Sequence, residues 1–108
     1  MLPSQIVVEL NRLTQELSKG YSALYEAECD LAEADKLLDT TEQKAFISAQ
    51  GTVADRTALA RLESSENRFQ RDLSRASVNR IKMKMRSLES ALTASQTMAK
   101  LIDTESRL

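Results

Sequence analysis

The stretch that decides the fold is residues 6–38, IVVELNRLTQELSKGYSALYEAECDLAEADKLL. Small or apolar residues recur in it at alternating spacings of four and three, which is typical of a helix with one apolar side. Because a lone helix gains too little free energy to persist in water, this line requires a partner helix. We term it the seam, and its members are Ile6, Leu10, Leu13, Leu17, Gly20, Leu24, Ala27, Leu31, Ala34 and Leu38.

The seam predicts a first helix over about residues 4–38. Asp39 and Glu42 have the spacing of a helix-capping pair, so we expect an interruption at this point. A short helix or turn over about residues 40–50 should follow. The sequence leaves open whether that segment is separate or extends the first helix.

A second helix is predicted over about residues 52–105, which contain no Gly or Pro. Gly51 suits a left-handed helix end, and Thr52 with Asp55 suits the cap of the next helix. The apolar residues of this helix form two stripes, the first being Leu59, Leu62, Phe69, Leu73 and Ala76 and the second Ile81, Met85, Leu88, Leu92, Ala99 and Ile102.

The two stripes are separated by a five-residue step from Ala76 to Ile81, which displaces them around the helix. We expect a continuous helix whose apolar face changes there. The alternative is a joint near residues 74–77, which would give a three-helix bundle.

The chain is therefore predicted to be all-α, a single domain of residues 1–108. Its architecture should be a long antiparallel helical hairpin or coiled-coil-like bundle, with two long helices and with or without a short third one. The helices should be unequal, about 50 Å and about 80 Å long. The end of the longer one would lack an intrachain partner, so we expect an oligomer in which Leu88, Leu92 and Ile102 belong to the packing seam. The apolar residues of that overhang are Met98, Leu101, Ile102 and Leu108.

Charge is distributed unevenly along the chain, although the net charge is only -1. Residues 1–55 hold ten acids and four bases, and residues 56–108 hold eleven bases and six acids. Such asymmetry indicates either a nucleic-acid or acidic partner, or pairing of the two halves with each other.

Bases in the second half recur on one side of the predicted helix. We term this set the basic ridge, and its members are Arg61, Arg68, Arg71, Arg75, Lys82 and Arg86. Two interpretations stay open. The ridge could bind phosphates, for which the planar fork of Arg is well suited. It could instead flank a coiled coil and pair with acids of the first helix, namely Glu26, Glu28, Glu33 and Asp35.

Two further bases, Arg80 and Lys84, flank the second apolar stripe. Their long side chains could cover that stripe with their methylene groups or reach a second chain.

The sequence contains no signature of an enzyme. It has no His, which removes the commonest general base and metal ligand, and it has no Gly-rich phosphate loop. The one cysteine, Cys29, lies between two acids that disfavour a thiolate. We therefore expect no catalytic residue, metal or cofactor. With no candidate membrane span and no signal peptide, we expect a cytoplasmic protein.

Two stretches, YSALYEAE at residues 21–28 and KMKMRSLE at residues 82–89, lie within a layout of long helices. In this layout the chain resembles the small helical recombination-mediator proteins of phages, the UvsY type. The resemblance implies an oligomer that binds single-stranded DNA and helps to load a recombinase, in the host cytoplasm if the chain is phage-encoded.

The leading functional prediction is thus a non-enzymatic, oligomeric accessory protein. It would bind the backbone of single-stranded DNA without sequence preference, in phage-type recombination, with a recombinase or another protein as a further partner. The alternative is a coiled-coil structural or adaptor protein that acts only through protein–protein contacts.

Overall fold

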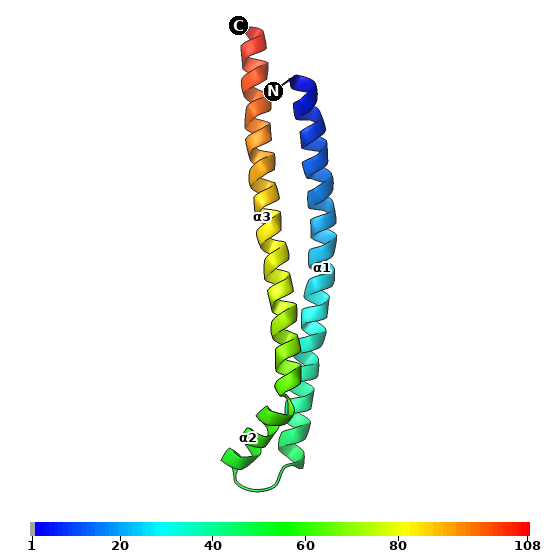
Figure 1. Cartoon of the computed structure of the whole chain (residues 1–108), viewed down its shortest axis with the longest axis vertical. Coiled ribbons are helices and arrows are strands. Elements are labelled where there is room, and N and C mark those ends of the chain that lie inside the picture. The colour runs from blue at the N-terminus through cyan, green and yellow to red at the C-terminus, as the bar shows by residue number, and fades with distance from the viewer. Residues whose placement is uncertain (1) are drawn as a thin grey trace. The chain divides into compact units, whose positions relative to one another are not determined.

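The computed structural model describes residues 2–108, and it confirms the all-α prediction for them. Three helices follow one another, α1 (Pro3–Ser48), α2 (Val53–Glu63) and α3 (Ser65–Arg107), and no strand occurs within the described chain (Figure 1). Contacts along the chain divide it into two compact units. Unit 1 comprises the chain up to Leu24 together with Arg80–Leu108, and unit 2 comprises Tyr25–Asn79.

Unit 1 packs the first part of α1 against the second part of α3 through an apolar interface. Ile6, Leu13 and Leu17 are buried on α1, and Met85 is buried on α3. The other predicted packing positions in this unit are half-buried, namely Leu10, Gly20, Leu24, Ile81, Leu88, Leu92, Ala99 and Ile102. The seam prediction is confirmed for this part of α1.

The predicted C-terminal overhang is wrong for Ile102. This residue lines a groove of about 340 Å³ together with Ile6 and Leu10 from the start of α1. The end of α3 therefore has a partner within its own unit. The expectation of an oligomer loses the part of its argument that rested on Ile102, whereas Met98, Leu101 and Leu108 are exposed.

In unit 2, α1 continues to Ser48, so the interruption predicted at Asp39 is wrong. The reason is that the spacing of the seam does not stop at Leu38. Thr41 is half-buried and Ala45 is buried, three and then four residues further on. The remaining seam positions of this unit are also buried or half-buried, namely Ala27, Leu31 and Ala34.

The turn between α1 and α2 forms as the sequence predicts. Gly51 adopts a positive φ of 113°. Thr52 caps α2 by accepting a hydrogen bond from the Asp55 amide, and the Asp55 carboxylate accepts one from the Thr52 amide, which completes a capping box. Arg56 closes the turn, because its Nε donates to the Phe46 carbonyl at 3.2 Å and its guanidinium lies 4.3 Å from the Phe46 ring centre.

The predicted continuous helix over residues 52–105 is wrong, and so is the alternative joint near 74–77. The break is at Ser64, which separates α2 from α3 and is fully buried. The Ser64 hydroxyl donates to the Ala60 carbonyl at 2.7 Å. A serine that bonds back to the preceding turn in this way bends a helix without Gly or Pro.

The predicted change of apolar face is also wrong, because one line of buried or half-buried residues runs the length of α3. Its members recur at spacings of three and four, and before Ile81 they are mostly polar. They are Asn67, Arg71, Ser74, Val78, Ile81, Met85, Leu88, Leu92, Ser95, Ala99 and Ile102. The first predicted stripe, Leu59, Leu62, Phe69, Leu73 and Ala76, is exposed.

Candidate nucleic-acid interface

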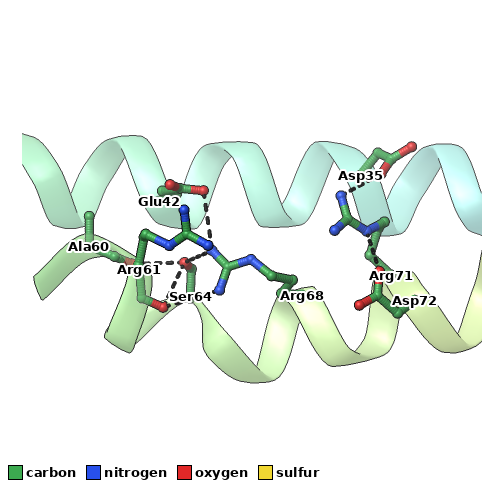
Figure 2. Close-up of polar contacts among 8 residues, drawn as sticks. All are labelled: Asp35, Glu42, Ala60, Arg61, Ser64, Arg68, Arg71 and Asp72. Atoms are coloured by element: carbon green, nitrogen blue, oxygen red, sulfur yellow. Dashed lines mark hydrogen bonds and ion pairs between the residues drawn. The ribbon is translucent and has the colours of Figure 1, made fainter. Parts of the chain in front are cut away.

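Arg68 of the basic ridge is part of the joint between α2 and α3 (Figure 2). Its guanidinium donates to the Ser64 hydroxyl at 3.2 Å and to the Arg61 carbonyl at 3.4 Å, and it lies 3.6 Å from the Glu42 carboxylate. The Arg68 side chain is 26% exposed. These contacts occupy most of the N–H donors of the Arg68 guanidinium. Arg68 therefore stabilises the fold of unit 2 and has few donors free for a ligand.

Arg71 is engaged in the same way, one turn further along α3 (Figure 2). Its Nε donates to Asp72 at 2.9 Å, and its NH1 lies 3.8 Å from Asp35 on α1. The Arg71 side chain is 21% exposed and occupies a position on the buried line of the helix. Asp35 was among the four acids expected to pair with the ridge, whereas Glu42 was not. The seven-residue interval from Asp35 to Glu42 is the signal that could have identified both.

The other four ridge residues are exposed, and they are divided between the units. Arg61 and Arg75 lie in unit 2, whereas Lys82 and Arg86 lie in unit 1. Over residues 2–108, none of these four side chains forms an ion pair within 4.0 Å. Arg68 and Arg71 are therefore engaged within unit 2, and the remaining four ridge residues belong to two units that are described separately.

The two units also differ in net charge, although by less than the two halves of the sequence do. Unit 1 holds eight bases and five acids, a net charge of +3, and unit 2 holds seven bases and eleven acids, a net charge of -4. The most basic stretch of unit 1 is residues 80–86, in which every charged residue is basic and exposed. These residues are Arg80, Lys82, Lys84 and Arg86.

Lys82 and Arg86 line a surface groove of about 200 Å³ in unit 1. The other residues of this groove are Tyr21, Leu24, Met85 and Glu89, and we term it the tyrosine groove. Tyr21 is more than half exposed, and its hydroxyl donates to Glu89 at 3.1 Å across the two helices. This hydrogen bond, together with the negative charge of Glu89, raises the pKa of the Tyr21 hydroxyl. The carboxylate thus holds the ring in place.

Sequence reasoning did not assign Tyr21 to the site. The signal was its position next to Gly20, a member of the seam, because a residue beside the contact line of α1 faces the edge of the partner helix. Without the register between α1 and α3, that position could not be matched with Lys82 or Arg86.

Other kinds of site find no support in the described residues. Across residues 2–108, no group of three or more Cys, Asp or Glu side chains is placed to hold a metal ion. None of the helices described above is both long and apolar enough to cross a membrane. No family model, curated protein or solved structure matches this chain.

Proposed function

We propose that the protein binds the backbone of single-stranded nucleic acid through unit 1, with the tyrosine groove as the point of contact. The observation that carries this proposal is the placement of an exposed aromatic ring, Tyr21, in one groove with two unpaired cations, Lys82 and Arg86. The proposed function involves no enzymatic activity, cofactor or metal.

The chemistry of the groove suits a single strand better than a duplex. An aromatic face can stack on any unpaired base, and cations beside it can neutralise the phosphates on either side. Neither interaction distinguishes one base from another, so binding should be independent of sequence. The net positive charge of unit 1 would attract the strand, whereas the net negative charge of unit 2 would repel it.

The test is a titration of labelled oligothymidylate, followed by fluorescence anisotropy at two salt concentrations. The wild-type protein should bind at low salt and weaken steeply as salt rises, because bound phosphates release counterions. Reversing both cations, Lys82→Glu with Arg86→Glu, should abolish binding. The matched control is Lys44→Glu with Lys100→Glu, which changes the net charge equally at two exposed positions outside the groove. Equal loss of binding in both double variants would contradict a specific groove.

The ring and the carboxylate can be tested separately. Tyr21→Ala should weaken binding roughly 5- to 150-fold, the effect of losing about 1–3 kcal/mol of stacking. Tyr21→Phe keeps the ring and should retain most of the affinity. Glu89→Gln removes the one acid of the groove and should strengthen binding by reducing repulsion of phosphate.

A second candidate function is an adaptor that works only through protein contacts. It is favoured by the exposed apolar residues of α2 and α3 in unit 2, which serve no packing role in that unit. If the oligonucleotide does not bind even at low salt, this adaptor function replaces the first proposal. A role in recombination, as the resemblance to mediator proteins implies, would require binding of both a strand and a recombinase.

A further inference from the structure

Unit 1 has two exposed bases close to the tyrosine groove that do not line it, Arg80 and Lys84. Within residues 2–108, neither side chain forms an ion pair within 4.0 Å. They are four residues apart on α3 and therefore lie on one side of that helix. We term them the second cation pair, and we term Lys82 and Arg86, which have the same spacing, the first cation pair.

The two pairs lie on opposite sides of the line that α3 buries against α1. Ile81 and Met85 belong to that line, and at about 100° per residue each pair is centred roughly 100° away from their midpoint. The grooves agree with this placement, because Lys82 and Arg86 line the tyrosine groove whereas Lys84 lines a separate groove of about 260 Å³. The arc of about 160° between the two pairs is the exposed face of α3.

This exposed face carries no acid between the two pairs. Met83 lies near its centre and is 69% exposed, and Ser87, one turn further on, is also exposed. The one acid between Asp72 and Asp103 is Glu89, which lines the tyrosine groove. A chain of phosphates that leaves the groove over this face therefore passes no negative side chain before it reaches the second cation pair.

The opposite direction, over α1, offers a strand no unpaired cation. The bases of α1 in unit 1 are Arg12 and Lys19. The Arg12 guanidinium lies 2.6 Å from the Glu9 carboxylate, and the Lys19 ammonium lies 3.9 Å from that of Glu16. Each base is balanced by an acid of the same helix, whereas the four cations of α3 are not. Electrostatic attraction therefore directs a bound strand over α3 rather than over α1.

We infer that a bound single strand continues from the tyrosine groove across the exposed face of α3 to the second cation pair. The inference rests on the proposed function, because Tyr21 and the first cation pair provide the first contact. Phosphates contact cations on both sides of the helix, and the strand covers Met83 between them. A flexible single strand can follow this curved surface, whereas a duplex, with a persistence length of about 150 base pairs, is too stiff.

The first test is the salt dependence of the affinity for labelled oligothymidylate, with Arg80→Gln and Lys84→Gln combined in one variant. For a single strand, the logarithm of the association constant falls with the logarithm of salt concentration by about 0.7 per neutralised phosphate. Four cations therefore predict a slope of about -2.8 for the wild type, and two predict about -1.4 for the double variant. The matched control is Lys36→Gln with Lys44→Gln, which removes the same charge from two exposed positions of unit 2 and should keep the wild-type slope.

The results separate this inference from the proposed function. If loss of the second cation pair leaves the slope unchanged while reversal of the first pair abolishes binding, the tyrosine groove binds the strand and the inference is overturned. If the control variant loses as much slope as the double variant, the attraction is general and the inference is again overturned. If the wild-type protein does not bind at low salt, the proposed function fails and the inference fails with it.

The second test locates the strand on α3 by methionine oxidation. Met83 lies on the inferred path, whereas Met98, which is 45% exposed, lies about four turns further along the same helix and serves as an internal control. Hydrogen peroxide converts both to sulfoxides, and mass spectrometry of peptides measures each rate. A saturating oligothymidylate should slow oxidation of Met83 severalfold and leave that of Met98 unchanged. Unchanged oxidation of Met83 in the complex, or equal protection of both, would overturn the path.

Discussion

Units 1 and 2 both pack part of α1 against part of α3, but they use different chemistry along the contact. In unit 1, α3 presents Ile81, Met85 and Leu88 to the seam. In unit 2 it presents Asn67, Arg71 and Ser74, with Val78 as the one apolar residue of this stretch, and charged side chains bridge the helices. The contact in unit 1 is stabilised by burial of apolar side chains. Burial contributes much free energy but depends little on the register between the two helices. The arrangement in unit 2 adds directional contacts that fix the register and contribute less free energy.

The substitution with the largest expected effect on stability is in unit 1. Leu13 is almost fully buried, at 1% exposure. Leu13→Ala should lower the free energy of unfolding by roughly 2–5 kcal/mol, because a buried leucine is replaced by a cavity. Leu73→Ala, at an exposed apolar position of α3, should change it by less than about 0.5 kcal/mol. Urea unfolding followed by circular dichroism measures both. Equal effects would mean that the assigned burial of the two positions is wrong.

A smaller effect is expected from Arg68→Met in unit 2. The substitution keeps the apolar stem but removes the donors to Ser64 and the charge facing Glu42. We expect a loss of about 1.5–3 kcal/mol, the range for a hydrogen bond to a charged group. Hydrogen exchange should show faster exchange of the amides around Ser64. Uniform acceleration along α1 and α3 would contradict a local role.

Arg68→Lys provides the control for that experiment. Lysine keeps the charge but cannot contact Ser64, Arg61 and Glu42 with one planar fork. Its stability should therefore lie between that of the wild type and that of the methionine variant.

Gly51→Ala tests the turn of unit 2. The backbone of Gly51 has a φ of 113°, and an added Cβ would lie 3.0 Å from the Asp55 carboxylate. The variant should lose about 1 kcal/mol or more, because alanine cannot adopt this conformation without strain. Gln50→Ala, at the neighbouring exposed position, should be nearly neutral. Thermal unfolding distinguishes the two.

The smallest effect concerns the cross-helix hydrogen bond of unit 1. The bond from Tyr21 to Glu89 raises the pKa of the Tyr21 hydroxyl in the folded state. Its stabilising contribution is present below the pKa of an unfolded tyrosine and is lost as the pH rises through the raised value. In a Tyr25→Phe background, absorbance titration follows Tyr21 alone. Glu89→Gln should move that titration to lower pH, and an unchanged titration would show that the bond does not form in solution.

The sequence predicted the parts of the fold that depend on local signals. The seam of α1 and the turn at Gly51, Thr52 and Asp55 follow directly from residue spacing and residue type. The end of α1 was misplaced because the capping signal at Asp39 was given more weight than the continued spacing to Thr41 and Ala45. Tertiary contact decides between such signals, because packing outweighs a single cap.

The parts that were missed depend on contacts between distant residues. Ser64 carries no breaker signature, and its bend shows only in the bond to Ala60. Leu62, Phe69 and Leu73 have the spacing of a core stripe, and nothing local indicates that they face outward. For the same reason, only part of the candidate site was predicted. The basic residues could be identified, whereas the pairing of Arg68 with Glu42 and the position of Tyr21 depend on the register of two helices.

The turn that closes α1 onto α2 has a consequence for how the chain folds. Its contacts join residues at most ten positions apart, as in the bond from Arg56 to Phe46. Short loops close quickly and with a small entropy loss. We expect this turn to act as the folding nucleus. The contacts between the helices should then form progressively away from the turn, and those near the chain termini should form last. Substitutions there should slow refolding, whereas substitutions near the termini should mainly accelerate unfolding.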